Sequence, residues 1–134
     1  MLPKINPETT QSWQNLEDHF AQNDFDFRSL FQQNPNRFND FSIKRPGYLF
    51  DFSKNLIDQQ TLNLLLQLAE ETQLKSAISA MFEGQKINET EDRAVLHTAL
   101  RDFSDDEILV DGENIKPGIK KVLDQMKTFS TKVI

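Results

Sequence analysis

The stretch from Lys86 to Arg101 constrains this chain most, because it joins a helix-start signal to an apolar run that needs burial. Asn88 is a favoured N-cap residue, and Glu91 follows three positions later, which is the spacing of a capping box. Behind this signal, apolar residues cover most of the circumference of a helix: Ala94, Val95, Leu96, Ala99 and Leu100. A helix that is apolar nearly all round is usually buried. The sequence therefore predicts a largely buried helix over about residues 90–101.

Three cationic side chains recur along this predicted helix. Arg93, His97 and Arg101 are four residues apart, so they point to one side. Such a row could meet the phosphate of a sugar phosphate. It could also pair with the chain's own carboxylates, or contact the rest of a longer protein. The second interpretation is favoured, because acidic residues outnumber lysines and arginines by 21 to 15. The set Asn88, Glu91, Arg93, His97 and Arg101 is therefore interpreted as a structural motif.

Apolar periodicity predicts helices along most of the remaining chain. The first carries Trp13, Leu16 and Phe20 on one stripe, after an N-cap and first-turn proline at Asn6-Pro7. A short helix around residues 30–31 ends at Asn34-Pro35. Asp58 is the expected N-cap of a helix whose apolar face carries Leu62, Leu65, Leu66 and Ala69. A further helix covers residues 73–82, either continuous with the last or kinked near Thr72.

Two short hairpins complete the predicted secondary structure. Residues 41–44 and 48–52 flank Pro46-Gly47, the central pair of a type II turn. Residues 108–110 and 113–115 flank Asp111-Gly112, a favoured two-residue hairpin turn. The chain lacks the strand–helix alternation of a parallel sheet. The fold class is predicted to be mainly α with two small β-hairpins (α+β), as a single region over residues 1–134.

The last predicted helix, residues 117–134, keeps an apolar stripe to its end: Ile119, Val122, Leu123, Met126, Phe129 and Val133. No glycine, asparagine or proline closes it, so the helix looks cut rather than finished. This favours a fragment of a longer chain. An uncovered stripe favours self-association or fraying. We expect either a dimer built on this face or poor order beyond about Phe129.

Charge and composition exclude several functions. The net charge of −6 argues against nucleic acid or an anionic membrane as the main partner. The chain has no cysteine, no glycine-rich phosphate loop, and no histidine spacing typical of a metal site. Met1-Leu2-Pro3-Lys4 is not followed by an apolar signal core, and no apolar run is long enough to span a bilayer. A cytoplasmic protein is the expectation.

Residues 81–101 resemble the N-terminal segment of the glucose-6-phosphate isomerase family. The family pattern is matched by Lys86-Ile87-Asn88, Thr90-Glu91, Arg93 to His97, and Ala99 to Arg101. Asp92 departs from it, since asparagine or glycine is more usual there. Flanking pieces agree in order and spacing: Trp13, Phe50-Asp51-Phe52-Ser53-Lys54-Asn55, and Val110-Asp111-Gly112. The resemblance covers essentially the whole chain, but only the first part of the family's chain.

The resemblance implies a cytoplasmic enzyme of glycolysis and gluconeogenesis. The family interconverts glucose 6-phosphate and fructose 6-phosphate by proton transfer through an enediol, with no cofactor and as a homodimer. Its fold is a larger α/β fold with two parallel-sheet sugar-isomerase domains, which lie downstream together with the catalytic residues. No catalytic, cofactor-binding or metal-binding residue is therefore expected here, and the fragment alone should be inactive. The alternative is a stand-alone, non-catalytic helical binding module.

Overall fold

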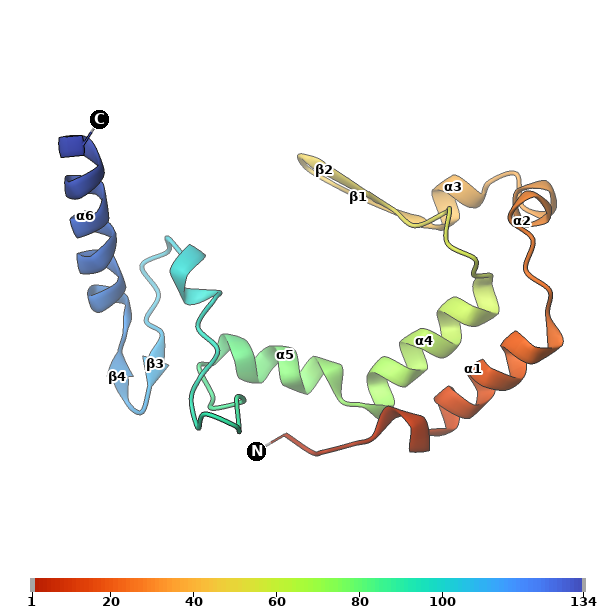
Figure 1. The fold of residues 1–134 in the computed structure, drawn as a ribbon, viewed down its shortest axis with the longest axis horizontal. Coiled ribbons are helices and arrows are strands. Elements are labelled where there is room, and N and C mark those ends of the chain that lie inside the picture. The colour runs from red at the N-terminus through yellow and green to blue at the C-terminus, as the bar shows by residue number, and fades with distance from the viewer. Residues whose placement is uncertain (1, 134) are drawn as a thin grey trace. The chain divides into compact units, whose positions relative to one another are not determined.

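A computed structural model describes residues 2–133 (Figure 1). The chain divides into two compact units, Ile5–Thr72 and Met1–Lys4 with Gln73–Ile134. The first unit contains η1 Pro7–Thr9, α1 Gln11–Gln22, α2 Phe27–Gln33, α3 Arg37–Asp40, β1 Ser42–Arg45, β2 Tyr48–Asp51 and α4 Gln59–Glu71. The second contains α5 Leu74–Phe82, η2 Ala99–Arg101, β3 Leu109–Val110, β4 Glu113–Asn114 and α6 Lys116–Val133. The predicted fold class, mainly helical with two small hairpins, is confirmed.

In the first unit, α1 packs along α4 (Figure 1). Polar groups of α1 are buried beside the apolar stripe that the sequence predicted, Trp13, Leu16 and Phe20. Ser12 and His19 are the buried residues of α1, whereas Phe20 is 74% exposed. The Ser12 hydroxyl donates to Glu71 Oε1 at 2.7 Å, which ties the start of α1 to the end of α4. The predicted stripe is therefore wrong at Phe20, and the helix itself is confirmed.

A buried arginine organises the segment between α3 and α4. Arg37 is 2% exposed. Its Nε donates to the Ser53 carbonyl at 2.7 Å, and one terminal nitrogen donates to the carbonyls of Asn55 and Ile57 at 2.8 and 2.7 Å. The guanidinium also lies over the ring of Phe41, 4.4 Å from its centroid. Burying a charge is costly unless it is hydrogen-bonded, and here three carbonyls and an aromatic face compensate for the lost hydration.

Both hairpins form at the predicted turns. Gly47 has φ +86°, as the third position of a type II turn requires. Asp111 and Gly112 are both left-handed, as a type I′ turn requires. Each hairpin is an isolated two-stranded sheet. On the β1–β2 hairpin, Ile43 faces Phe50 across the strands, and both side chains are exposed.

Asp58 caps α4 as predicted, since its side chain accepts the Thr61 N–H at 2.7 Å. Of the two alternatives that the sequence left open near Thr72, the helix is broken there: Gln73 is left-handed, with φ +57°. A right-handed helix cannot pass through such a residue. This residue separates α4 from α5.

The predicted buried helix over residues 90–101 does not form. Asn88 and Arg93 are joined by two antiparallel backbone hydrogen bonds of 3.2 Å, and Asp92 between them is left-handed with φ +49°. Residues 94–98 are irregular, and only η2 is helical. The apolar pattern was misleading because a helix apolar all round needs a covering surface on every side. This unit does not supply one: Ala99 is buried, but Leu100 is 50% exposed.

The last helix, α6, forms over almost the predicted range, and its apolar stripe is uncovered. None of its described residues is buried. Phe129 and Val133 are each 70% exposed, and Met126 is 61% exposed. Residue 134, the end of the predicted helix, lies outside the described residues. Within residues 2–133, no helix is both long and apolar enough to cross a bilayer.

Candidate functional site

Three residues of the predicted motif, Asn88, Glu91 and Arg93, lie in a tight turn. The Asn88 amide donates to the Glu91 carboxylate at 2.9 Å, and Arg93 forms an ion pair with that same carboxylate. Asn88 and Glu91 therefore interact, as the capping-box spacing suggested. They do so through a hydrogen bond between their side chains, and no helix begins at this point. Lys86 pairs with Asp111 at 3.0 Å, and Lys4 pairs with Glu89 at 2.6 Å. The turn is a cluster of opposite charges.

The predicted row of cations does not form, because its helix does not form. Arg93 is exposed within the turn. His97 and Arg101 are also exposed, and they share a second turn in which an Arg101 guanidinium nitrogen donates to the His97 carbonyl at 3.2 Å. The structure thus brings Asn88, Glu91 and Arg93 together, and it places His97 and Arg101 in a separate local contact.

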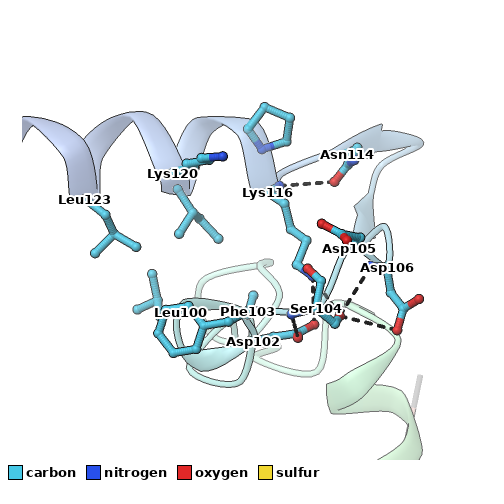
Figure 2. A pocket seen from close by; sticks show the side chains of 13 residues that line it. Leu100, Asp102, Phe103, Ser104, Asp105, Asp106, Asn114, Lys116, Lys120 and Leu123 are labelled. Atoms are coloured by element: carbon cyan, nitrogen blue, oxygen red, sulfur yellow. Dashed lines mark hydrogen bonds and ion pairs between the residues drawn. The ribbon is translucent and has the colours of Figure 1, made fainter.

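A hollow lies between the loop after η2 and the first half of α6 (Figure 2). Its volume is about 460 Å³, which would suit a small ligand. One end is polar and the other apolar. Figure 2 shows Leu100 and Phe103 opposite Leu123, with Lys116, Ser104 and the acidic residues at the far end. The apolar end is open, since Phe103 is 87% exposed.

Lys116 is the central polar residue of this hollow, and its ammonium is fully engaged. It forms an ion pair with Asp102 Oδ2 at 3.0 Å and donates to the carbonyl and hydroxyl oxygens of Ser104 at 2.6 and 3.1 Å. An ammonium has three protons to donate, so none remains for a phosphate oxygen. Lys116 therefore supplies no phosphate donor in this arrangement.

Asp102 is the most strongly perturbed carboxyl group of the hollow. The backbone N–H of Ser104 donates to Asp102 Oδ1 at 2.9 Å. This hydrogen bond, the Ser104 hydroxyl and the Lys116 ammonium lower the pKa of Asp102 from 3.8 to about 2. Hydrogen bonds and a nearby cation favour the ionised form. A carboxylate with so low a pKa is a poor general base near neutral pH. The arrangement fixes a loop to a helix start and does not resemble a catalytic pair.

Sequence reasoning missed this cluster. A usable signal was present, because aspartate and serine two residues apart, as at Asp102 and Ser104, are typical of a side chain that accepts a backbone N–H in a turn. The distant partner, Lys116, follows only from the fold. Among residues 2–133, no group of three or more histidine or acidic side chains is placed to hold a metal ion.

Comparison with known proteins defines the class to which this chain belongs. Residues 51–134 match the family model described as phosphoglucose isomerase. The chain is 48% identical over 134 residues to a glucose-6-phosphate isomerase of Desulforapulum autotrophicum. That alignment covers 99% of this chain and 24% of the relative, so the chain spans about a quarter of the relative's length. The chain belongs to the phosphoglucose isomerase family.

Proposed function

We propose that this chain is the helical, non-catalytic N-terminal region of a glucose-6-phosphate isomerase. The observation that carries the proposal is the 48% identity along almost the whole chain to a quarter of such an enzyme. Residues 1–134 then form one mainly helical region, and the sugar-isomerase domains lie outside it. The parent enzyme interconverts glucose 6-phosphate and fructose 6-phosphate in glycolysis and gluconeogenesis. It works in the cytoplasm as a homodimer without a cofactor.

The chemistry of the described residues supports a non-catalytic role. Isomerisation through an enediol needs a base beside the substrate carbon, with a pKa near the working pH. Asp102 has its pKa lowered to about 2, and the donors of Lys116 are already used. We therefore assign no catalytic, cofactor-binding or metal-binding residue to this chain. Asn88, Glu91, Arg93, His97 and Arg101 are proposed to act as a structural motif.

Two enzyme assays test the proposal. In the first, the purified chain is given fructose 6-phosphate, and formation of glucose 6-phosphate is followed through a coupled dehydrogenase. No turnover above a blank is expected. In the second, the chain replaces the matching quarter of the Desulforapulum autotrophicum enzyme. The chimera should keep isomerase activity, because the transplanted region supplies structure only. The same enzyme without that quarter is the control and should be inactive.

Either assay can contradict the proposal. Turnover by the chain alone, lost in Arg93→Ala, would place catalysis within these residues. A chimera that folds but is inactive would favour the second candidate function, a stand-alone helical binding module. The exposed stripe of α6 is the observation that favours this second candidate, because large exposed apolar patches commonly mark interaction sites.

A further inference from the structure

His19, the buried histidine of α1, has a partner for each of its two ring nitrogens. Its side chain is 8% exposed. Nε2 lies 3.1 Å from Asp58 Oδ1 at the start of α4, and Nδ1 lies 3.2 Å from the side-chain nitrogen of Asn23. The ring of Phe25 lies beside the imidazole, with the two centroids 5.6 Å apart. One side chain therefore contacts both the neighbouring helix and the end of its own helix.

The hydrogen bonds of Asn23 determine which ring nitrogen carries the proton. Asn23 Nδ2 also lies 2.7 Å from the backbone carbonyl oxygen of His19, which can only accept a hydrogen bond. The nitrogen end of the amide must therefore face His19, and its second N–H is a donor to Nδ1. Nδ1 is then the unprotonated acceptor, and Nε2–H donates to Asp58. The neutral ring is satisfied at both nitrogens in this one tautomer.

A second proton on the ring conflicts with this arrangement at Nδ1. The new N–H would face the Asn23 N–H, so two donors would meet at a buried position. Turning the amide over does not resolve the conflict, because Asn23 Oδ1 would then face the His19 carbonyl oxygen from the position that Nδ2 now occupies. A buried donor without an acceptor is costly. The Asn23 side chain therefore has to move away from the charged ring.

The charged groups that approach His19 from other segments act at its other nitrogen. Asp58, at the start of α4, accepts from Nε2–H whether the ring is neutral or charged. Arg37 of α3 donates to the carbonyl of Ile57, next to Asp58, and its positive charge is attracted to Asp58. A hydrogen bond between an imidazolium and a carboxylate is stronger than one from a neutral ring. Protonation therefore strengthens the contact with α4 and breaks the contact with Asn23.

We propose that His19 is a pH-sensitive switch at the C-terminal end of α1. In its neutral form it holds Asn23, the C-cap residue, whose backbone N–H donates to the Phe20 carbonyl. In its charged form it releases the Asn23 side chain, so residues 23–26 between α1 and α2 loosen while α1 stays on α4. Histidine is the side chain that can change its charge within the physiological pH range. The switch lies within the first unit and does not depend on the proposed function.

NMR of the 134-residue chain labelled with nitrogen-15 tests the switch in a titration from about pH 8 to about pH 5, the range in which histidines commonly titrate. At the alkaline end, the ring nitrogens of His19 should show the Nε2–H tautomer. As His19 takes up its proton, the Asn23 side-chain amide should shift with the same midpoint, and the backbone order parameters of residues 23–26 should fall. The exposed His97 is the second histidine of the chain, and His97→Gln should leave this response unchanged.

Two substitutions at exposed positions test the role of Asn23. In Asn23→Ala, residues 24–26 should be loose at both ends of the titration, so their order parameters should no longer respond to pH. Gln22→Ala, in the same turn, is the matched control and should keep the response. A pH response that survives in Asn23→Ala would overturn the role of Asn23. The switch itself would be overturned by an Nδ1–H tautomer at the alkaline end, by an Asn23 amide that stays fixed while His19 is protonated, or by a His19 that stays neutral until the chain unfolds.

Discussion

His19 Nε2 lies 3.1 Å from Asp58 Oδ1, so a buried histidine of α1 contacts the residue that caps α4. The same carboxylate oxygen accepts the N–H and hydroxyl of Thr61 at 2.7 and 2.8 Å. Burial opposes ionisation of Asp58, but its hydrogen bonds with Thr61 and His19 outweigh this and lower its pKa. One carboxylate therefore starts a helix and also holds the neighbouring helix against it.

Removing this carboxylate should cost stability through both contacts. Asp58→Ala is expected to lower the free energy of unfolding by about 1–3 kcal/mol, from a lost cap and a lost hydrogen bond to His19. Asp58→Asn should cost less, because asparagine also caps helices well. Urea unfolding of the three proteins measures the difference. Equal losses in the two variants would show that capping contributes little here.

Arg37 should tolerate no substitution. Arg37→Lys leaves at least one of three buried carbonyls without a donor, since one ammonium cannot reproduce the geometry of the guanidinium. We expect a loss of about 2–4 kcal/mol, because each unsatisfied buried group costs about 1–3 kcal/mol. Arg28→Lys, on the exposed side of α2, is the matched control and should change stability by less than about 0.5 kcal/mol. A loss below about 1 kcal/mol for Arg37→Lys would contradict this account.

Alanine substitutions at three glycines can distinguish the cost of a left-handed backbone from the cost of a steric clash. Gly84 has φ +71°, and a Cβ there would lie 2.7 Å from the Leu109 carbonyl oxygen, whereas Gly47 has φ +86° and open space. Gly47→Ala should cost about 1 kcal/mol, the usual penalty of the left-handed region. Gly84→Ala should cost clearly more, because the clash is with backbone. Gly118→Ala, in α6 with no neighbour within 4 Å, should be neutral or stabilising by up to about 1 kcal/mol. Thermal unfolding measures the stability of the three variants. If Gly84→Ala and Gly47→Ala lost the same stability, the clash with the Leu109 carbonyl would contribute nothing.

The Asp102 cluster predicts a pH dependence. Because the folded pKa, about 2, lies below the unfolded value of 3.8, the ionised carboxylate stabilises the fold above about pH 4. That contribution is lost as the pH falls from about 4 towards 2. Carboxyl chemical shifts followed by NMR should show Asp102 titrating near pH 2, and Lys116→Met should move its pKa upwards. A measured pKa near 3.8 for Asp102 in the unmodified chain would show that Ser104 and Lys116 do not stabilise its ionised form.

Local signals predicted much of the fold, and the failures share one cause. Turns and caps depend on a few neighbouring residues, so Asp58, Pro46-Gly47 and Asp111-Gly112 were assigned correctly. The helix over residues 90–101 was not, because a capping pattern at Asn88 and Glu91 is also satisfied in a turn closed by Arg93. The geometry of the turn around Asn88 also depends on distant partners, such as Lys86 with Asp111. Lys116 was missed for the same reason, since its partner Asp102 is remote in sequence.

The contacts of Arg37 also bear on the order in which the first unit assembles. Its hydrogen bond to the Ser53 carbonyl joins residues 16 positions apart in the sequence. The hydrogen bond between Ser12 and Glu71 joins residues 59 positions apart. Loop-closure entropy grows with the logarithm of length, so the shorter closure is easier by about 1 kcal/mol. The segment around Arg37 should therefore become ordered before α1 docks on α4. The arginine would then act early in folding, as a local nucleus against which the slower, long-range helix pairing is completed.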